Sequence, residues 1–507
     1  MKIFCTASSD AYITDKIINQ SFRADDANTG KAGTLDLYKL YDETLLSGSD
    51  KQNELSRILV KFDLGKVRSL FPDVIDTRSS RFKAEIKLFD VQTGFSSPSN
   101  FSVIAYPLSQ SFDEGVGKNI SGFTDLGVVN FLTASIVNGH PQAWYASGAN
   151  RVGGLNTNPI DIISSGTIGG TEYQFFGTQY FKEGNEDLVI NVTNAVSGVL
   201  SNDLPDLGFR ISFSGSDESD KKTRFVKRFA TRHSSNPHLR PRLEISFDDS
   251  IIDHRGNFYF DTTGSIFLRN SRRSENKNFI VNGTELNADD SLTVKLVKGS
   301  FSKIFEGSQH RAGSENSGVE GIYSSSFSLS VDDQEEYEPG KKLSDLIASE
   351  RKVEFKEYWS FGNKGLHTGS IVIKSDETQD RFRDDNIEIY SINCKLSYDS
   401  KDRERIDLFG VNHTEDEELP RKRSIKKTSK IFQTVHYRVL DADSHKMIFD
   451  FDEVNHSTRV SSDVSGMYFN FHFDVLPVGR AYVFEYLVSH NGMRKVIRDD
   501  RTRFTVV

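Results

Sequence analysis

Apolar and polar residues alternate along much of this chain, most clearly between residues 187 and 247. Leu188–Val192 alternates with a period of two, which is typical of a β-strand with one buried face. The next segment, Thr193–Asn202, spaces its apolar residues as on one face of a helix, and we expect Thr193 to cap it. Two more alternating runs follow, at Gly208–Phe213 and Leu243–Phe247. This order of strand, short helix, strand and strand indicates the end of an antiparallel β-sandwich.

The same alternation recurs from the start of the chain, so we expect residues 1–250 to form one domain. Between Gly115 and Tyr180 it gives way to a stretch rich in Gly, Asn and Ser that also carries aromatic residues. A loop of that length without structure is uncommon in a compact domain, so we interpret residues 115–180 as a surface excursion with short strands of its own. The elements predicted before it are strands at Lys2–Thr6, Thr34–Tyr38, Ser56–Phe62, Arg81–Phe89 and Ser102–Pro107, and a helical turn at Val67–Phe71.

Two further domains are predicted after this one. In residues 251–375, period-two runs and the hairpin signal Asn282-Gly283 predict a small β-sandwich, with one helical turn at Lys342–Ser349. Residues 376–507 hold about seven strand-like runs, the number found in an immunoglobulin-like sandwich, although the Cys–Trp–Cys signature is missing. The expected fold class is therefore all-β, with an N-terminal sandwich followed by two smaller ones.

One segment of the third domain also predicts a partner surface. Its apolar residues are Met467, Phe469, Phe471, Phe473 and Val475, and they alternate with Tyr468, Asn470, His472 and Asp474. The apolar set indicates a core. We expect the polar set to stay available to a partner, because an unpaired edge strand invites association.

Composition narrows the function. The chain has 507 residues and a net charge of −9, whereas a dedicated nucleic-acid binder usually carries a basic excess, so we expect no nucleic-acid partner. Its 38 Phe and 17 Tyr agree with a β-rich protein. No run approaches the ~20 apolar residues that a membrane span requires, and we expect no membrane association. Only two cysteines, Cys5 and Cys394, are present, which excludes a disulfide framework.

Recognisable catalytic motifs are missing from the sequence. HEXXH, GXSXG, the phosphate-binding Gly-Lys loop and paired CXXC do not occur, so we expect neither enzymatic activity nor a cofactor. The segment Asp248–His254 holds three aspartates and a histidine, which can gather around a divalent cation. Its acids can equally cap turns or pair with Arg255 and Arg242. Whether a metal binds there stays open on the sequence alone.

Two basic segments raise the question of a charged partner. Lys221–Arg242 interleaves Phe225 and Phe229 with Lys and Arg, a composition that can follow a phosphate backbone. Against that interpretation, the run also alternates and is flanked by acids. The second segment, Leu419–Lys430, follows an acidic stretch and is either a solvated loop or a bridge to a neighbouring subunit. Its candidate partner-binding residues are Arg421, Lys422, Arg423, Lys426 and Lys427.

Aromatic residues in the excursion offer a different candidate site. Trp144 and Tyr145 lie in AWYASG, and aromatic faces of this kind stack on pyranose rings. They are equally typical of a packed core or a protein interface, where Trp, Tyr and Phe are concentrated. We favour packing, and keep Trp144 and Tyr145 as the candidate glycan platform.

Several segments of the first half resemble a known family. They are SSDAYITD at Ser8–Asp15, SRILVKFDL at Ser56–Leu64, FKAEIKLF at Phe82–Phe89, FATRH at Phe229–His233 and PRLEI at Pro241–Ile245. Together with the strand–helix–strand order described above, they resemble the DNRLRE-type domains of bacterial surface proteins and phage virion proteins. The resemblance implies that residues 1–250 form a jelly roll, in which the basic segment Lys221–Arg242 is a pair of strands. Some modules of this type bind carbohydrate.

A second resemblance concerns the rest of the chain. FDDSIIDHRGNFYF at Phe247–Phe260, HTGSI at His367–Ile371 and STRVSSDVSGMYFNFHF at Ser457–Phe473 look like segments of structural proteins of tailed, particularly marine, phages. This resemblance implies a virion component of the neck, tail, baseplate or fibre region, made in the host cytoplasm. Its partners would be other virion proteins and copies of itself. The alternative is a carbohydrate-binding adhesion module on a phage or bacterial surface, with a host glycan as its ligand.

Overall fold

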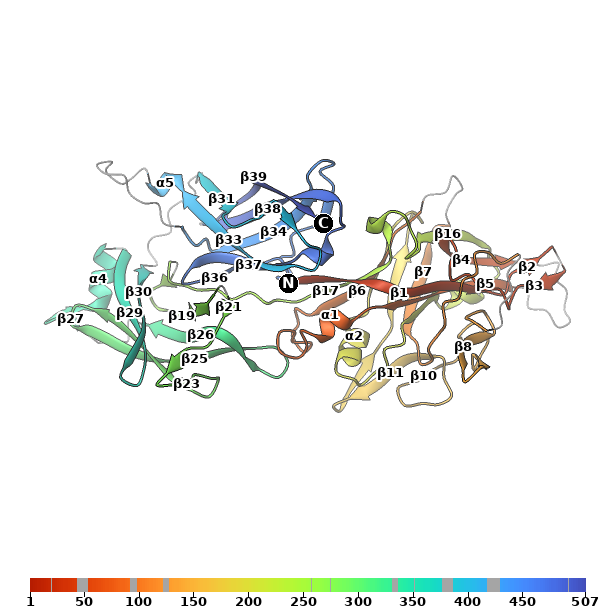
Figure 1. The fold of residues 1–507 in the computed structure, drawn as a ribbon, viewed down its shortest axis with the longest axis horizontal. Coiled ribbons are helices and arrows are strands. Elements are labelled where there is room, and N and C mark those ends of the chain that lie inside the picture. The colour runs from red at the N-terminus through yellow and green to blue at the C-terminus, as the bar shows by residue number, and fades with distance from the viewer. Residues whose placement is uncertain are drawn as a thin grey trace. The chain divides into compact units, whose positions relative to one another are not determined.

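The computed structural model describes the chain except for residues 20, 43–52, 92–97, 122–126, 257, 274, 331–335, 351, 376–385, 417–428 and 491. Strands dominate the described residues, so the chain is an all-β, multi-domain protein, as predicted (Figure 1). It divides into two compact units. The N-terminal unit comprises residues 3–69 and 82–246, and the C-terminal unit comprises residues 1–2, 70–81 and 247–507.

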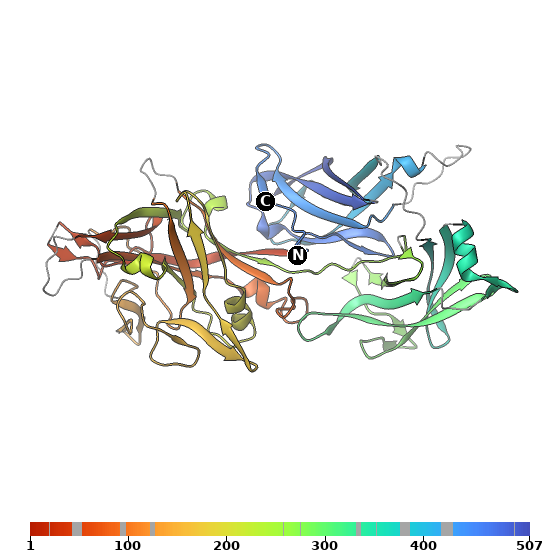
Figure 2. The ribbon, with the colours of Figure 1, turned by 180° about the vertical axis from the view of Figure 1, so that it is seen from behind.

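A ten-stranded sheet is the frame of the N-terminal unit (Figures 1 and 2). Eight strands follow one another in the order β13–β7–β15–β5–β1–β17–β6–β14, and β4 joins β16 to β5. Neighbours in this sheet come from both ends of the unit, so long-range pairing holds it together. The strands are β1 Lys2–Thr14, β4 Thr34–Tyr41, β5 Asn53–Phe62, β6 Lys83–Leu88, β7 Phe101–Pro107, β13 Gly177–Phe181, β14 Leu188–Asn191, β15 Phe209–Phe213, β16 Arg224–Ala230 and β17 Arg242–Ser246.

Helices are few and short in the described residues. The predicted helix is present as α2, Thr193–Leu200, and it buries Ala195, Val196, Val199 and Leu200. The expected cap is wrong, because Val192 occupies the capping position and the Thr193 hydroxyl accepts a hydrogen bond from the Ala84 N–H at 3.0 Å instead. The other α-helices are α1 Gly65–Arg68, α3 Ser216–Ser219, α4 Leu343–Glu350 and α5 His413–Asp416. None of these described helices is long and apolar enough to span a bilayer.

The surface excursion has strands of its own, as predicted. They form a hairpin of β8 Thr133–Val137 and β9 His140–Ala143, and a sheet of β10 Val152–Gly154, β11 Ile162–Ile168 and β12 Thr171–Gln174. Two buried arginines of the large sheet hold it down. Arg57 donates to the Gly148 carbonyl at 2.7 Å, and Arg210 donates to the Asn150 side chain at 3.3 Å. The sheet face beneath is therefore covered rather than open.

The first part of the C-terminal unit is a single curved sheet. Its seven strands run in the order β18–β30–β29–β24–β25–β26–β19, and the two layers expected of a sandwich are two parts of this sheet. It curls so far that the ring of Phe258, on one edge strand, lies 4.4 Å from that of Phe327 on β26. The strands are β18 Phe258–Tyr259, β19 Thr262–Arg269, β24 Leu292–Lys298, β25 Phe301–Ala312, β26 Ser317–Leu329, β29 Lys352–Phe361 and β30 Lys364–Lys374.

The hairpin and the helical turn predicted for this part are both present. Asn282 and Gly283 both have positive φ and connect β22 Ile280–Val281 to β23 Thr284–Glu285, which pair antiparallel. A two-residue turn of this kind is the one that Asn-Gly favours. The predicted helical turn is α4. Residues 70–81 also belong here, because the Ser314 N–H donates to the Pro72 carbonyl at 2.8 Å.

The last part of the chain is an immunoglobulin-like sandwich of a four-stranded and a five-stranded sheet. Its core is aromatic, with the ring of Tyr437 stacked 4.2 Å from that of Phe469. The strands are β31 Ile387–Ser391, β33 Arg403–Asn412, β37 Gly466–His472 and β36 Ser461–Asp463 in one sheet, and β32 Ser397–Tyr398, β39 Met493–Val506, β38 Arg480–His490, β34 Thr434–Asp441 and β35 Met447–Phe449 in the other.

The polar face expected on β37 is largely covered. Met467, Phe469, Phe471, Phe473 and Val475 form the predicted core, but Tyr468 and His472 are buried as well. Tyr468 stacks against the Arg405 guanidinium, 3.4 Å from its ring centroid, and Arg405 is paired with Asp463. Residues 251–253 lie beside β36, where the Ser462 N–H donates to the Ile251 carbonyl at 2.8 Å. The strand pattern could not reveal this covering segment, which lies about 210 residues away in the chain.

Candidate functional site

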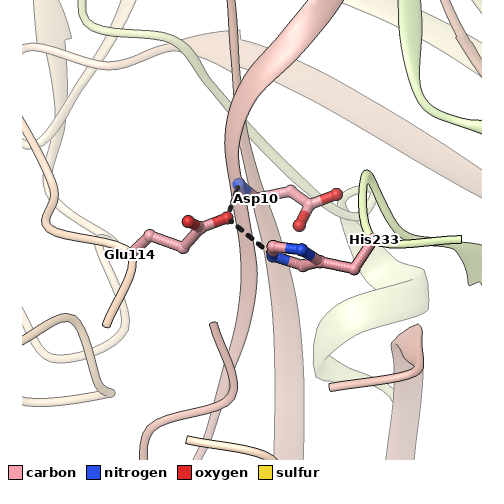
Figure 3. A group of neighbouring side chains, drawn as sticks. All are labelled: Asp10, Glu114 and His233. Atoms are coloured by element: carbon pink, nitrogen blue, oxygen red, sulfur yellow. Dashed lines mark hydrogen bonds and ion pairs between the residues drawn. The ribbon is translucent and has the colours of Figure 1, made fainter. Parts of the chain in front are cut away.

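Three segments of the N-terminal unit bring Asp10, Glu114 and His233 together (Figure 3). Asp10 lies on β1, Glu114 lies at the start of the excursion, and His233 follows β16. One carboxylate oxygen of each acid and one ring nitrogen of the histidine lie within 4.8 Å of one another. In the described part of the chain, this is the one group of three or more His, Cys, Asp or Glu residues that is so closely spaced.

Backbone packing fixes Glu114 in this position. The Asn28 side chain donates to the carbonyl of Glu114 and to that of Val129, both at 2.8 Å, and it accepts from the Gly117 N–H at 2.7 Å. A Cβ atom on Gly30 would lie 1.9 Å from the Glu114 carbonyl oxygen. Only glycine permits so close an approach of the two backbones. The start of the excursion is therefore clamped to the loop that precedes β4.

Hydrogen bonds connect the three segments at the side chains. The Asp10 N–H donates to Glu114 Oε1 at 2.9 Å, and the Arg232 N–H donates to Asp10 Oδ2 at 2.6 Å. The Arg232 guanidinium grips both Glu114 oxygens at 2.6 Å, and His233 Nε2 lies 3.6 Å from Glu114 Oε1. Asp10, Glu114, Arg232 and His233 are called the Asp10 cluster from here on.

The charges of the Asp10 cluster do not balance when both acids are ionised, because one guanidinium faces two carboxylates. Asp10 is only 1% exposed, and its Oδ1 is buried without a hydrogen-bond donor among the described residues. Burial, reinforced by the charge of Glu114, raises the pKa of Asp10 to about 7, although hydrogen bonding and charge from Arg232 oppose the shift. The cluster therefore has an incompletely compensated carboxylate at its centre.

Five basic residues of the segment Lys221–Arg242 are paired with acids inside the N-terminal unit. Arg224 binds Asp217 and Asp220, each at 2.7 Å, and the buried Lys227 binds Asp90. The remaining pairs are Arg228 with Asp36, Arg232 with Glu114, and Arg242 with Glu244. These arginines and this lysine stabilise the strand pair by internal ion pairing. Phe225, by contrast, is exposed.

The acidic segment Asp248–His254 does not converge on one point. Asp248 pairs with Arg81, and Asp253 pairs with Arg255, as the interpretation with turn caps and arginines anticipated. His254 Nδ1 lies 3.1 Å from the Ser265 carbonyl oxygen. Arg242, the other arginine considered, pairs with Glu244 instead. Each of these side chains thus has a separate partner.

The remaining candidate residues have different surroundings. Trp144 is 5% exposed and donates its indole N–H to the Asn130 carbonyl at 3.0 Å, so its ring is packed in a core. Tyr145 is 50% exposed and keeps a free face. The candidate partner-binding residues Arg421, Lys422, Arg423, Lys426 and Lys427 lie outside the described residues.

Sequence reasoning missed the Asp10 cluster. Asp10 and His233 lie in SSDAYITD and FATRH, which were singled out as fold motifs rather than as chemistry. Glu114 was not singled out, and it lies 104 residues from Asp10. A local spacing cannot signal a site that three distant segments build. The one sequence signal for this cluster was the presence of aspartates in SSDAYITD and of a histidine in FATRH.

Comparisons with known proteins do not assign this chain to a family. No protein-family model matches it, and no curated protein matches it. Among solved structures, trypsin-activated alpha-2-macroglobulin from Escherichia coli aligns with 90% of this chain and 23% of its own, at 7% identity and a TM-score of 0.16. The BSP domain of a biofilm-associated protein covers 96% and 68%, at 8% identity and a TM-score of 0.18. The FN1–FN3 domains of chicken CNTN1 cover 59% and 82%, at 9% identity and a TM-score of 0.13.

Proposed function

We propose that this chain is a structural component of a tailed-bacteriophage virion, in the neck, tail, baseplate or fibre region, and that it acts through protein–protein assembly. Its sequence resemblances to DNRLRE-type domains and to tailed-phage structural proteins support this role. The paired charges of the basic segment also favour a structural role over nucleic-acid binding. Copies of the chain and other virion proteins are the proposed partners.

The observation that carries the proposal is the outward face of the curved sheet in the C-terminal unit. Ile304, Lys295, Tyr358 and Thr368 are cross-strand partners in one row, which we call the open sheet face. Ile304 is 63% exposed and Tyr358 is also exposed, whereas the opposite face of these strands holds the buried core. Exposed apolar and aromatic side chains on a regular sheet are typical of a protein interface.

Locating the protein in purified particles tests the proposal. We expect mass spectrometry to detect it at a fixed copy number and gold-labelled antibody to place it at one structural region. Absence from intact, infectious particles contradicts the proposed function. The open sheet face is tested separately with Ile304→Asp, which should fold normally and enter particles at reduced occupancy. The matched control is Ile280→Asp, because Ile280 is 56% exposed in the same unit but lies off this face.

Carbohydrate binding is the second candidate, and the exposed ring of Tyr145 favours it. With Trp144 packed inside, a stacking platform would rest on Tyr145 and on the polar groups around it. Wild-type binding to a glycan array that is lost in a folded Tyr145→Ala protein would support this alternative. An array without signal for the full chain would remove it.

A further inference from the structure

The Asp10 cluster has the ligand types and the spacing of a divalent metal site. Three ligand atoms within 4.8 Å of one another can share one ion, because metal–ligand distances near 2.0–2.2 Å place ligands at most about 4.4 Å apart when opposite, and small side-chain rotations close the difference. Figure 3 shows the His233 imidazole beside both carboxylates, with the three side chains coming from separate segments. Among the described residues, Glu114 Oε2 accepts one hydrogen bond, from Arg232, so one of its two lone pairs remains.

A second observation points to a ligand at this place. Asp10 is only 1% exposed, yet its Oδ1 accepts no hydrogen bond from the described part of the chain. Buried carboxylate oxygens are normally hydrogen-bonded, because an unmet acceptor costs free energy. The Arg232 N–H donates to Asp10 Oδ2 and orients the carboxylate, and the backbone N–H of Asp10 donates to Glu114, so neither bond reaches Oδ1. A cation would satisfy this oxygen.

From this geometry we propose that Asp10, Glu114 and His233 bind one divalent transition-metal ion of the Zn²⁺ or Mn²⁺ class. Two carboxylates and one imidazole form a set that suits these ions, whereas Ca²⁺ takes six to eight oxygen ligands and Mg²⁺ keeps most of its water. Three protein ligands leave the other coordination positions to water. This inference does not depend on the proposed virion role.

Arg232 has a defined part in this site. Its guanidinium binds both Glu114 oxygens, and its backbone N–H orients the Asp10 carboxylate. The guanidinium compensates one of the two carboxylates and leaves the second for the ion. Outer hydrogen bonds that fix a ligand's orientation are a regular feature of metal sites. The same positive charge also opposes the ion, so removal of the guanidinium should strengthen binding.

The ion would connect three segments that are far apart in sequence: β1, the start of the excursion and the turn after β16. A ligand that binds the folded state and not the unfolded state stabilises the fold by mass action. We therefore expect metal to raise the melting temperature of the N-terminal unit. The turn at residues 113–117 and residues 231–234 should also become better protected from hydrogen exchange.

The test uses the full chain, treated with chelator and titrated with ZnCl₂, MnCl₂ and CaCl₂ by calorimetry. We expect one Zn²⁺ or Mn²⁺ per chain at a saturable site. Asp10→Asn and His233→Gln should each weaken that site at least about tenfold. His140→Gln is the matched control for adventitious binding, because His140 is exposed in the same unit, and it should bind as the wild type does.

Arg232→Gln supplies a readout that simple misfolding would not give. It should bind the ion more tightly than the wild type, while Asp10→Asn and His233→Gln bind more weakly. Hydrogen exchange on all variants checks that the fold is retained. The proposal is overturned if the wild type binds no stoichiometric ion, if Asp10→Asn and His233→Gln bind as the wild type does, or if only Ca²⁺ binds at this site.

Discussion

Two regions of this protein hold the same charges in different arrangements. The Asp10 cluster in the N-terminal unit has two acids and one arginine, and so does a set in the C-terminal unit formed by Asp253, Arg255 and Glu357, which we call the Arg255 triad. Arg255 lies between its acids and pairs with both, at 2.6 Å to Glu357 and closely to Asp253. Arg232, by contrast, forms its side-chain pair with Glu114 alone.

Hydrogen bonding differs in the same way. Every carboxylate oxygen of the Arg255 triad has a donor: Asp253 accepts from the backbone N–H groups of Arg255 and Phe267, each at 2.8 Å, and Glu357 accepts from the Trp359 indole as well as from Arg255. Asp10, by contrast, keeps Oδ1 without a donor from the part of the chain that the structure describes. Burial raises the pKa of Asp253 to about 6, less than for Asp10, because Arg255 opposes the rise directly.

Both regions contain two carboxylates and one guanidinium. The geometry of these groups therefore distinguishes the Arg255 triad, which is structural, from the Asp10 cluster, which is a candidate site. The Arg255 triad is complete and needs no ligand. The Asp10 cluster has the same two acids and one guanidinium, with His233 beside them, and among the described residues it leaves one carboxylate charge and Oδ1 of Asp10 unmet. Substitutions that act on one set and not on the other therefore test the distinction.

The largest expected effect comes from Arg255→Gln. The substitution leaves two buried carboxylates without their cation, which typically costs about 3–5 kcal/mol. Chemical denaturation of the full chain, followed by hydrogen exchange at β29, measures the free energy of unfolding of the C-terminal unit. Arg311→Gln is the control, because its ion pair with Asp289 is exposed and should contribute less than about 1 kcal/mol. If Arg255→Gln lowers the free energy of unfolding no more than Arg311→Gln does, Arg255 does not compensate its two acids as described.

The next effect compares one substitution at two places. Asp253→Asn puts an amide among donors from Arg255 and Phe267 and should cost about 1–3 kcal/mol. Asp10→Asn keeps an oxygen for the Arg232 N–H and places its amide where no donor lies, so we expect a loss below about 1 kcal/mol in metal-free protein. Parallel denaturation curves give both values. Equal losses would mean that the two sets are equivalent.

The sequence predicted those features that neighbouring residues determine. Period-two runs predicted most strands, Asn282-Gly283 predicted its hairpin, and residues 342–349 predicted α4, because each depends on local backbone preference. Features set by distant partners were missed or wrong. Thr193 bonds to Ala84 rather than capping its helix, and Tyr468 is covered by Arg405.

The candidate site belongs to the second kind. Trp144 and Tyr145 are adjacent in the sequence, yet one is packed in a core and the other is exposed, and the alternation gives no warning of the difference. Glu114 reaches Asp10 only because Asn28 and Gly30 hold the start of the excursion against their own loop. The charge composition of the basic segment likewise did not reveal all of its partners, because Arg228 pairs with Asp36, which lies 192 residues away.

A third arrangement, with one carboxylate between two cations, extends the comparison to the opposite charge balance through an effect that depends on pH. Asp220 accepts from the fully buried Lys39, and from Arg224 Nη1 at 2.7 Å and Nη2 at 2.9 Å. Hydrogen bonding from Arg224, followed by that from Lys39, holds the pKa of Asp220 below its ordinary value. A carboxyl group whose pKa is lower in the folded state stabilises the protein above its unfolded pKa of about 4 and loses that contribution as the pH falls.

Asp220→Asn has no proton to take up there, so its stability should fall less steeply with acidification than that of the wild type. The gap between the two proteins should be widest at neutral pH and should narrow below about pH 4. Thermal melts of the N-terminal unit across this range measure the gap, with Asp203→Asn as the exposed control, whose curve should run parallel to the wild type. Parallel curves for Asp220→Asn and the wild type down to about pH 2 would show that the two cations do not hold this carboxylate in its charged form.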